Sequence, residues 1–138
     1  MRDDLSIIAR SGLLVSFLIF GIAASATSPA YSDQYLDYKP DISDGKESFK
    51  KCVACHTVKP EIHFRGPSLH GVMSRKVMSA EGYKYSSSAK TLKGIWTAQR
   101  LFTFVRNPRK MLKDTKCFVG FGRHQDAANM VAYLATAR

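Results

Sequence analysis

Cysteine is scarce in this chain of 138 residues: there are three, so they cannot all pair within the chain. A small disulfide-stabilised domain would have more cysteines and an even number of them, so this class is excluded. The length fits one domain, and 45% apolar residues are enough for a core and too many for a disordered chain. Internal repeats and the alternation of polar and apolar residues typical of strands are also lacking.

Acidic residues are the second shortage. The chain has 11 Asp and Glu against 21 Lys and Arg, a net charge of +10 at pH 7. This excess favours an acidic partner surface, anionic lipid or nucleic acid, although a solvated basic surface without a special role is an equal alternative. Because the N-terminus indicates export, as described next, we expect no nucleic-acid partner.

An apolar run as long as a membrane-spanning helix is missing as well. The uncharged run Leu13–Ala26 falls short of the roughly twenty residues that a span needs. It ends in Ala24-Ser25-Ala26, which matches the small-residue pattern of a signal-peptide cleavage site. We therefore predict a signal peptide at residues 1–26 and a periplasmic protein. Asp3 and Asp4 weaken this interpretation, so an uncleaved anchor that holds the protein to the membrane, facing the periplasm, is the alternative.

The rest of the chain predicts helices separated by a long loop. Residues 27–43 are polar, contain two prolines and are interpreted as an N-terminal strap; the domain proper would occupy residues 44–138. Asp44 is the expected N-cap of the first helix, on which Phe49 and Val53 would share a face.

Two more helices are expected in the second half of the chain. Thr97 would cap a helix that runs to Arg106 and is stopped by Asn107-Pro108, and another helix would run from Gln125 to the C-terminus. Residues 57–95 between the first two helices have no helical pattern. A loop of this length in a small domain is reasonable if it wraps a large apolar prosthetic group that completes the core.

The segment Cys52-Val53-Ala54-Cys55-His56 identifies that group. Two residues between the thiols place them one helical turn apart, which matches the two vinyl groups of haem, and the adjacent His56 can bind the iron. A thioredoxin-like redox pair would need strand–helix units that are absent here. A zinc site would need a second pair of ligands, for which Cys117 and His124 are a poor match.

A set of further motifs follows CVACH in order along the chain: Gly66-Pro67-Ser68-Leu69-His70-Gly71, Arg75-Lys76, Gly82-Tyr83-Lys84-Tyr85-Ser86, Gly94-Ile95-Trp96, Asn107-Pro108 and Val131-Ala132-Tyr133-Leu134. With them the chain from Asp44 onward resembles the class I c-type cytochromes of the mitochondrial cytochrome c and bacterial cytochrome c2 type. The resemblance implies an all-α cytochrome c fold, with three main helices and long loops wrapped around one covalently bound haem c. It also implies an electron carrier rather than an enzyme.

The resemblance implies roles for individual residues. Cys52 and Cys55 would form the thioethers, His56 would be the proximal iron ligand, and Pro67 would present its carbonyl to the other ring nitrogen of His56. Three residues occupy positions where the family hydrogen-bonds a buried haem propionate: Arg75, Tyr85 and Trp96. By itself Trp96 would be read as a core aromatic residue. The first and last helices would pack through Gly45 and Phe49 against Met130 and Tyr133.

The chain departs from the family at the second iron ligand. Where the family has P-G-T-K-M-x-F, this chain has Lys113–Val119 (KDTKCFV), so the ligand methionine is replaced by Cys117. Phe104 stands where the family has a tyrosine that touches the ligand, and Ala89 where it often has an asparagine of the same network. A thiolate ligand would stabilise ferric iron and lower the reduction potential, whereas methionine raises it.

Several alternatives to Cys117 ligation are open, including an unligated iron position. Other side chains could take the place of the thiol: Lys116, Met111, Lys113, Met73, Met78 or His124. We expect His63, His70 and His124 to be surface or packing residues.

The favoured function is a monomeric periplasmic electron carrier whose haem edge is surrounded by lysines that attract acidic redox partners. The lysines in question are Lys50, Lys51, Lys59, Lys110 and Lys116. The alternatives are a haem-based sensor, or a protein that processes a small molecule or sulfur compound, with a labile thiolate ligand. A membrane-associated haem subunit would follow from an uncleaved N-terminus.

Overall fold

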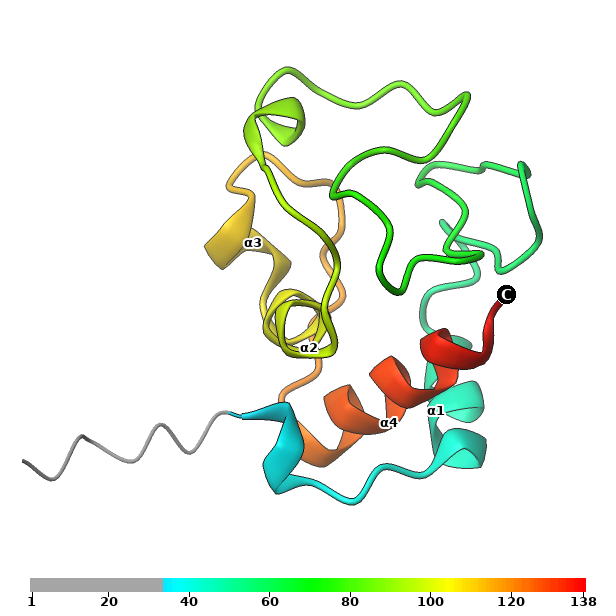
Figure 1. The fold of residues 1–138 in the computed structure, drawn as a ribbon, viewed down its shortest axis with the longest axis vertical. Coiled ribbons are helices and arrows are strands. Elements are labelled where there is room, and N and C mark those ends of the chain that lie inside the picture. Colours follow the sequence, from blue (N-terminus) through cyan, green and yellow to red (C-terminus); the bar gives the residue numbers. More distant parts are fainter. Residues whose placement is uncertain (1–33) are drawn as a thin grey trace, which may run out of the picture. The chain divides into compact units, whose positions relative to one another are not determined.

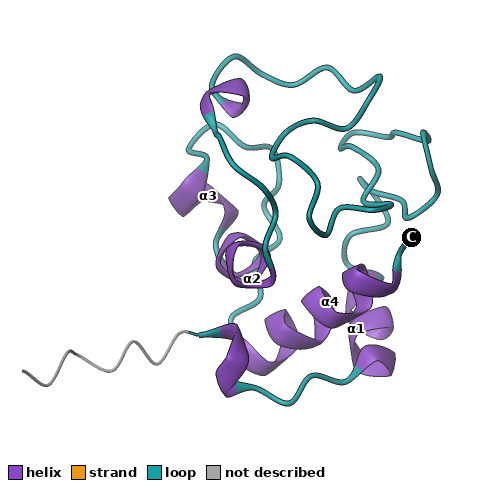
Figure 2. Cartoon of the chain, in the orientation of Figure 1, coloured by secondary structure: helices purple, strands orange, loops and turns teal. Residues whose placement is uncertain are grey.

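Helices and loops make up the fold, without extended strands in the part that is described. The computed structural model describes residues 34–138; the predicted signal peptide or anchor at 1–26 and the start of the strap lie outside them. The described α-helices are α1 (Ile42–Phe49), α2 (Ala98–Arg106), α3 (Pro108–Met111) and α4 (His124–Thr136) (Figures 1 and 2). Two short 3-10 helices, η1 (Tyr35–Asp37) and η2 (Ala89–Thr91), accompany them. The expected all-α class is confirmed.

Helix α1 begins earlier than predicted. Asp41, not Asp44, is its N-cap: Asp41 has an extended backbone and its carboxylate accepts a hydrogen bond from the Asp44 amide at 2.9 Å. The predicted cap, Asp44, was wrong because Asp41, three residues earlier, is equally suited to cap a helix. The helix also ends at Phe49, so Val53 lies beyond it and is half exposed.

Helix α2 has the predicted boundaries. The Thr97 hydroxyl accepts a hydrogen bond from the Arg100 amide at 3.1 Å, and Asn107 ends the helix. Helix α3, which was not predicted, follows directly: Asn107 caps it through the Lys110 amide, and Pro108 occupies its first turn, where proline is favoured. Helix α4 starts at His124, one residue before the predicted start.

Helices α1 and α4 cross and pack against each other (Figure 1). A Cβ atom on Gly45 would lie 2.1 Å from the Asn129 carbonyl oxygen and 2.8 Å from Tyr133 Cβ, so only glycine permits this approach. The rings of Phe49 and Tyr133 pack with centroids 5.4 Å apart, and Met130 is buried in the same core. The predicted pairing of the first and last helices is confirmed.

The long loop predicted at residues 57–95 is present, with η2 and one isolated antiparallel bridge, between Lys76 and Ile95, as its regular features. The described end of the strap packs on the core: Tyr38 stacks at 5.5 Å from Phe102, and the Tyr35 amide donates to Gln99. Within residues 34–138, none of the helices combines the length and hydropathy that crossing a bilayer requires.

Candidate functional site

The segment from Cys52 to His56 forms a turn just after α1. The amides of Cys55 and His56 both donate to the Cys52 carbonyl, at 3.0 and 2.8 Å, and the Cys52 amide donates to the Phe49 carbonyl. Both thiols are free and half-buried. Burial, reinforced by the nearby charges of Cys117 and Cys55, raises the pKa of Cys52 to about 11. The turn therefore presents both thiols from the end of a helix anchored in the core.

His56 is held in one orientation by its neighbours. Its Nδ1 donates to the Pro67 carbonyl at 2.7 Å, so the predicted contact between these residues is present. A Cβ atom on Gly66 would lie 2.3 Å from His56 Cε1, so the glycine backbone lies close against the ring. Burial lowers the pKa of His56, partly offset by the bond to Pro67. A neutral imidazole with Nδ1 occupied is suited to binding a metal through Nε2.

Arg75, Tyr85 and Trp96 come together from the long loop and its end. The backbones of Arg75 and Trp96 are paired, with the Trp96 amide 2.9 Å from the Arg75 carbonyl, and Trp96 is buried. Burial raises the pKa of Tyr85; the Ala80 amide, which donates to its hydroxyl, and the nearby Arg75 charge partly offset the rise. Arg75 Nη1 and Nη2 donate to the His70 and Ser68 carbonyls.

One polar atom in this group lacks a partner among the described residues. Arg75 Nε is buried and makes no hydrogen bond there. A buried donor without an acceptor is costly, so an additional acceptor is expected at this point. The carboxylate of a haem propionate would be such an acceptor.

Cys117 lies on the loop between α3 and α4, close enough to Cys52 and Cys55 for electrostatic interaction. It is half-buried; its amide donates to Thr115 Oγ1 at 3.1 Å. Burial raises the pKa of its thiol, and the charge of Cys55 adds to the rise. The fold thus brings Cys117, which is far away in the sequence, into the region of Cys52 and Cys55.

The other side chains considered as ligands have different surroundings. Lys113 and Lys116 are exposed, whereas the three methionines considered are partly buried and pack against the core: Met73, Met78 and Met111. His124 stacks against the rings of Tyr38 and Phe102, 5.8 and 6.1 Å away. Among the described residues, no group of three or more His, Cys, Asp and Glu side chains is arranged to hold a metal ion.

Two features of this region were not predicted from the sequence. The first is the packing of Gly66 on His56, which the Gly-Pro pair at 66–67 could have suggested. The second is a hydrogen bond from Ser88 Oγ to Asp114 Oδ2, between the long loop and the Cys117 loop. The replacement of the family's Pro-Gly by Lys113-Asp114 marked the second position, but no sequence signal identified its partner.

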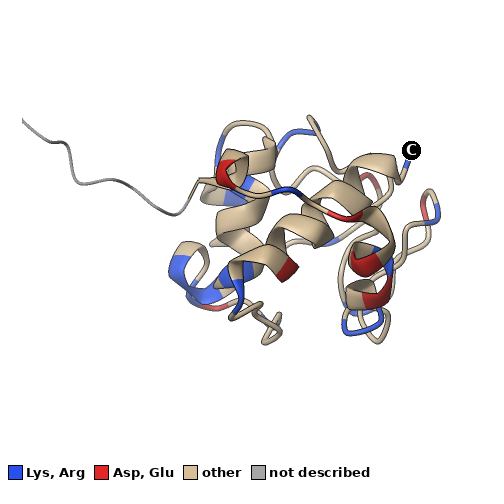
Figure 3. Cartoon of the chain, turned by 90° about the horizontal axis from the view of Figure 1, so that it is seen from below, with Lys and Arg blue, Asp and Glu red and all other residues tan. Residues whose placement is uncertain are grey.

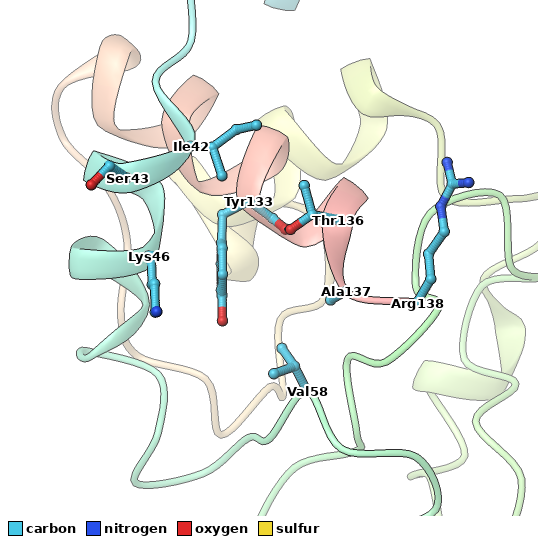
Figure 4. A pocket seen from close by; sticks show the side chains of 8 residues that line it. All are labelled: Ile42, Ser43, Lys46, Val58, Tyr133, Thr136, Ala137 and Arg138. Carbon is cyan, nitrogen blue, oxygen red and sulfur yellow. The ribbon is translucent and has the colours of Figure 1, made fainter.

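A pocket of about 610 Å³ lies along α1 and the end of α4 (Figure 4). Lys46 and Tyr133 extend side by side along it, and Val58 faces them. No cysteine lines it, so it is separate from the three thiols.

The residues on the described chain fit a covalently bound haem. Two thiols and a neutral imidazole with an oriented ring match the donor set that haem c requires. The orphaned Arg75 Nε matches a propionate, and the long loop has little regular structure of its own.

Comparison with known proteins leads to the same group. The family model described as cytochrome c matches residues 42–138. The chain is 37% identical over 100 residues to a cytochrome c of Sesamum indicum, which covers 70% of this chain and 90% of that protein. A cytochrome c of Gibberella zeae is 41% identical over 98 residues, covering 68% of this chain and 92% of its own length.

A bacterial relative completes the comparison. The "Cytochrome c-type cyt cy" of Rhodobacter capsulatus is 40% identical over 98 residues, covering 70% of this chain and 49% of that protein. The family model spans well over half of the chain, and the motifs that carry the resemblance lie within it. The chain belongs to the cytochrome c family, whose members bind one covalently attached haem c and carry electrons.

Proposed function

We propose that this cytochrome is a periplasmic one-electron carrier whose iron is bound by His56 and Cys117 and whose reduction potential is therefore low. The observation that carries the proposal is the position of Cys117. It occupies the place of the family's ligand methionine, and its half-buried thiol lies near Cys52 and Cys55.

The chain's own residues would hold the cofactor as follows. Cys52 and Cys55 would form the thioether links, and His56 would bind iron through Nε2 while Nδ1 donates to Pro67. Arg75 would use its free Nε to bind a propionate, with Tyr85 and Trp96 beside it. Bound haem c supplies an iron atom that accepts and releases one electron.

Cys117 would set the potential. An anionic sulfur stabilises ferric iron, whereas the neutral thioether of methionine favours ferrous iron. Phe104 stands where the family has a tyrosine; its ring offers no hydroxyl and packs against Trp96, with ring centroids 5.1 Å apart. Without a hydroxyl at that position, a thiolate would be neutralised mainly by the iron itself.

The charge distribution supports a partner with an acidic docking surface. The lysines expected at the haem edge are all exposed: Lys50, Lys51, Lys59, Lys110 and Lys116. Basic residues collect on α3 and the loop after it, whereas α1 carries acidic residues (Figure 3). The predicted signal peptide supports export to the periplasm, and we propose that the exported protein acts as a monomer; N-terminal sequencing would decide between cleavage and an anchor.

Replacement of Cys117 tests the ligation. We expect the ferric wild-type protein to give the low-spin EPR signal of a thiolate ligand. Cys117→Met should lose this signal and raise the potential by on the order of 100 mV or more, since axial ligands move haem potentials over about 0.8 V. Identical EPR spectra of the two proteins would exclude Cys117 as a ligand.

The same proteins separate a carrier from a sensor. A carrier keeps both iron ligands in both oxidation states, so carbon monoxide should bind the ferrous wild-type protein slowly. Rapid binding, measured by stopped-flow absorbance, would instead indicate a ligand that dissociates on reduction and would contradict the carrier proposal.

A further inference from the structure

A hydrogen bond connects the Cys117 loop to a distant part of the chain. Ser88 Oγ donates to Asp114 Oδ2. Among the hydrogen bonds that residues 113–119 make within the described part of the chain, this one alone reaches beyond residues 108–121. We propose that Ser88 and Asp114 are positioning residues that hold this loop so that Cys117 is presented to the iron. The inference rests on the proposed ligation by Cys117.

Ser88 is held in place by hydrogen bonds of its own turn. Ser88 is half-buried; its hydroxyl lies 3.1 Å from Ser86 Oγ, and its backbone carbonyl accepts a hydrogen bond from Thr91 Oγ1 at 2.7 Å. Helix η2 follows immediately, and Ala89 at its start is buried. Ser88 is therefore part of a hydrogen-bonded turn anchored in the protein interior.

Asp114 lies on a segment with few attachments of its own. The loop leaves the core after Leu112, which is buried, and returns at Phe121, whose amide donates to the Val105 carbonyl at 3.1 Å. Between these two anchors, the hydrogen bonds that Cys117 makes with described residues stay within its own loop, through Thr115 and Val119. Phe118 is 72% exposed and lies against Arg109 of α3, at 5.1 Å. The bond from Asp114 to Ser88 adds an attachment to a different part of the fold.

Holding the loop matters because other ligands are near in sequence. Lys113 and Lys116 flank Cys117 on the same loop, and an amine could bind iron if the loop shifted. The Pro-Gly pair of the family is missing here, and with it the fixed backbone angle of the proline. A side-chain bond from Asp114, next to Lys113, restrains the backbone at that point instead.

The test uses the haem-loaded protein and cyanide as the probe. Cyanide can reach the ferric iron only after the protein ligand has left, so its binding rate reports how often the loop opens. Loss of one exposed hydrogen bond corresponds to a change of about fivefold. Ser88→Ala and Asp114→Ala should each increase the rate about fivefold, and the double variant should be no faster than either single one.

Three variants serve as comparisons. Asp114→Asn keeps an acceptor for the Ser88 hydroxyl and should bind cyanide near the wild-type rate. Ser87→Ala changes an exposed neighbouring serine, and Asp37→Ala removes an exposed carboxylate on η1; neither should alter the rate. Circular dichroism and the haem absorbance of each variant verify that it is folded and loaded.

The outcomes distinguish failure of this inference from failure of the proposed ligation. If Cys117→Ser leaves the ferric EPR spectrum unchanged, Cys117 is not a ligand, and both the proposed ligation and the positioning role are contradicted. If Cys117→Ser changes the spectrum while Ser88→Ala and Asp114→Ala bind cyanide at the wild-type rate, the positioning role alone is overturned. Additive effects in the double variant would also overturn it, since two residues acting through one bond cannot add.

Discussion

The ring of His56 is confined on two sides, by a hydrogen bond and by a backbone. The Pro67 carbonyl accepts a hydrogen bond from His56 Nδ1 at 2.7 Å. Gly66 lies so close to the ring that a methyl group there would be 2.3 Å from Cε1 and 2.7 Å from both ring nitrogens. An added methyl group would force the ring or the Gly66 backbone to move, and rotation of the ring would break the bond to Pro67. Two adjacent loop residues therefore fix the orientation of the proposed proximal ligand.

Gly66→Ala should consequently weaken iron binding by His56. Contacts that orient a metal-binding histidine are worth about 10- to 100-fold in metal affinity, so part of the ferric protein should become high-spin. The high-spin fraction, measured by EPR, checks this prediction. Gly122→Ala is the control, because a methyl group there meets no atom within 4 Å; an all-low-spin Gly66→Ala protein would show that the contact is unimportant.

At this scale, local sequence carried most of the information about the site. Cys52, Cys55 and His56 were predicted as haem-binding residues because their spacing itself has chemical meaning. The Ser88–Asp114 bond was not, because it joins residues 26 positions apart and depends on how two irregular loops meet. Spacing along the chain reports one turn of backbone, whereas contacts between loops are set by the whole fold.

Among the elements, the crossing of α1 and α4 depends on a single missing side chain. Gly45 lets α1 approach until its Cα faces the Asn129 carbonyl, and Phe49 then packs on Tyr133 one turn further along. The cysteine turn begins immediately after Phe49, with the Cys52 amide bonded to its carbonyl at 2.7 Å. The position of the thiols thus follows from the helix crossing.

Gly45→Ala should destabilise the fold. In an exposed helix this change gains up to about 1 kcal/mol. Here the new methyl group would lie 2.1 Å from a backbone oxygen, and overpacking costs about 1–3 kcal/mol, so the clash outweighs the gain. The free energy of unfolding, measured with guanidinium chloride, should fall by about 1–2 kcal/mol.

The matched variant for this change is again Gly122→Ala, which adds the same methyl group in open space. Its free energy of unfolding should stay level or rise by about 0.4–1 kcal/mol, because the unfolded chain loses freedom. A Gly45→Ala protein as stable as this control would contradict the close helix crossing.

The elements themselves were largely predictable, with errors at their ends. Thr97 was recognised as a cap because one suitable residue precedes the apolar pattern, whereas Asp41 and Asp44 offered a choice that only the backbone resolves. Helix α3 was missed because Pro108 was read as the end of α2, although proline is equally suited to begin a helix. One residue type with two roles cannot be assigned from sequence alone.

Over the whole molecule, charge is distributed unevenly. Helix α1 and its cap contain three acidic residues, Asp41, Asp44 and Glu47, against one basic residue, Lys46; Glu47 also pairs with Lys50, just beyond the helix, at 2.6 Å. The segment from Arg109 to Lys116 has four basic side chains and one acidic one, and it directly precedes Cys117. Anionic reactants should therefore be attracted to the basic surface beside Cys117 rather than to α1.

Small redox reagents of known charge test this asymmetry without a physiological partner. Lys110→Glu, on α3, should slow oxidation of the reduced protein by anionic ferricyanide about tenfold at low salt and accelerate oxidation by cationic hexaammineruthenium. Lys46→Glu, on α1, changes the net charge equally and should have a much smaller effect. Both differences should shrink near 0.1 M salt, where the Debye length is about 10 Å. Equal effects of the two substitutions in stopped-flow measurements would mean that net charge alone, and not the basic surface beside Cys117, governs the approach of reactants.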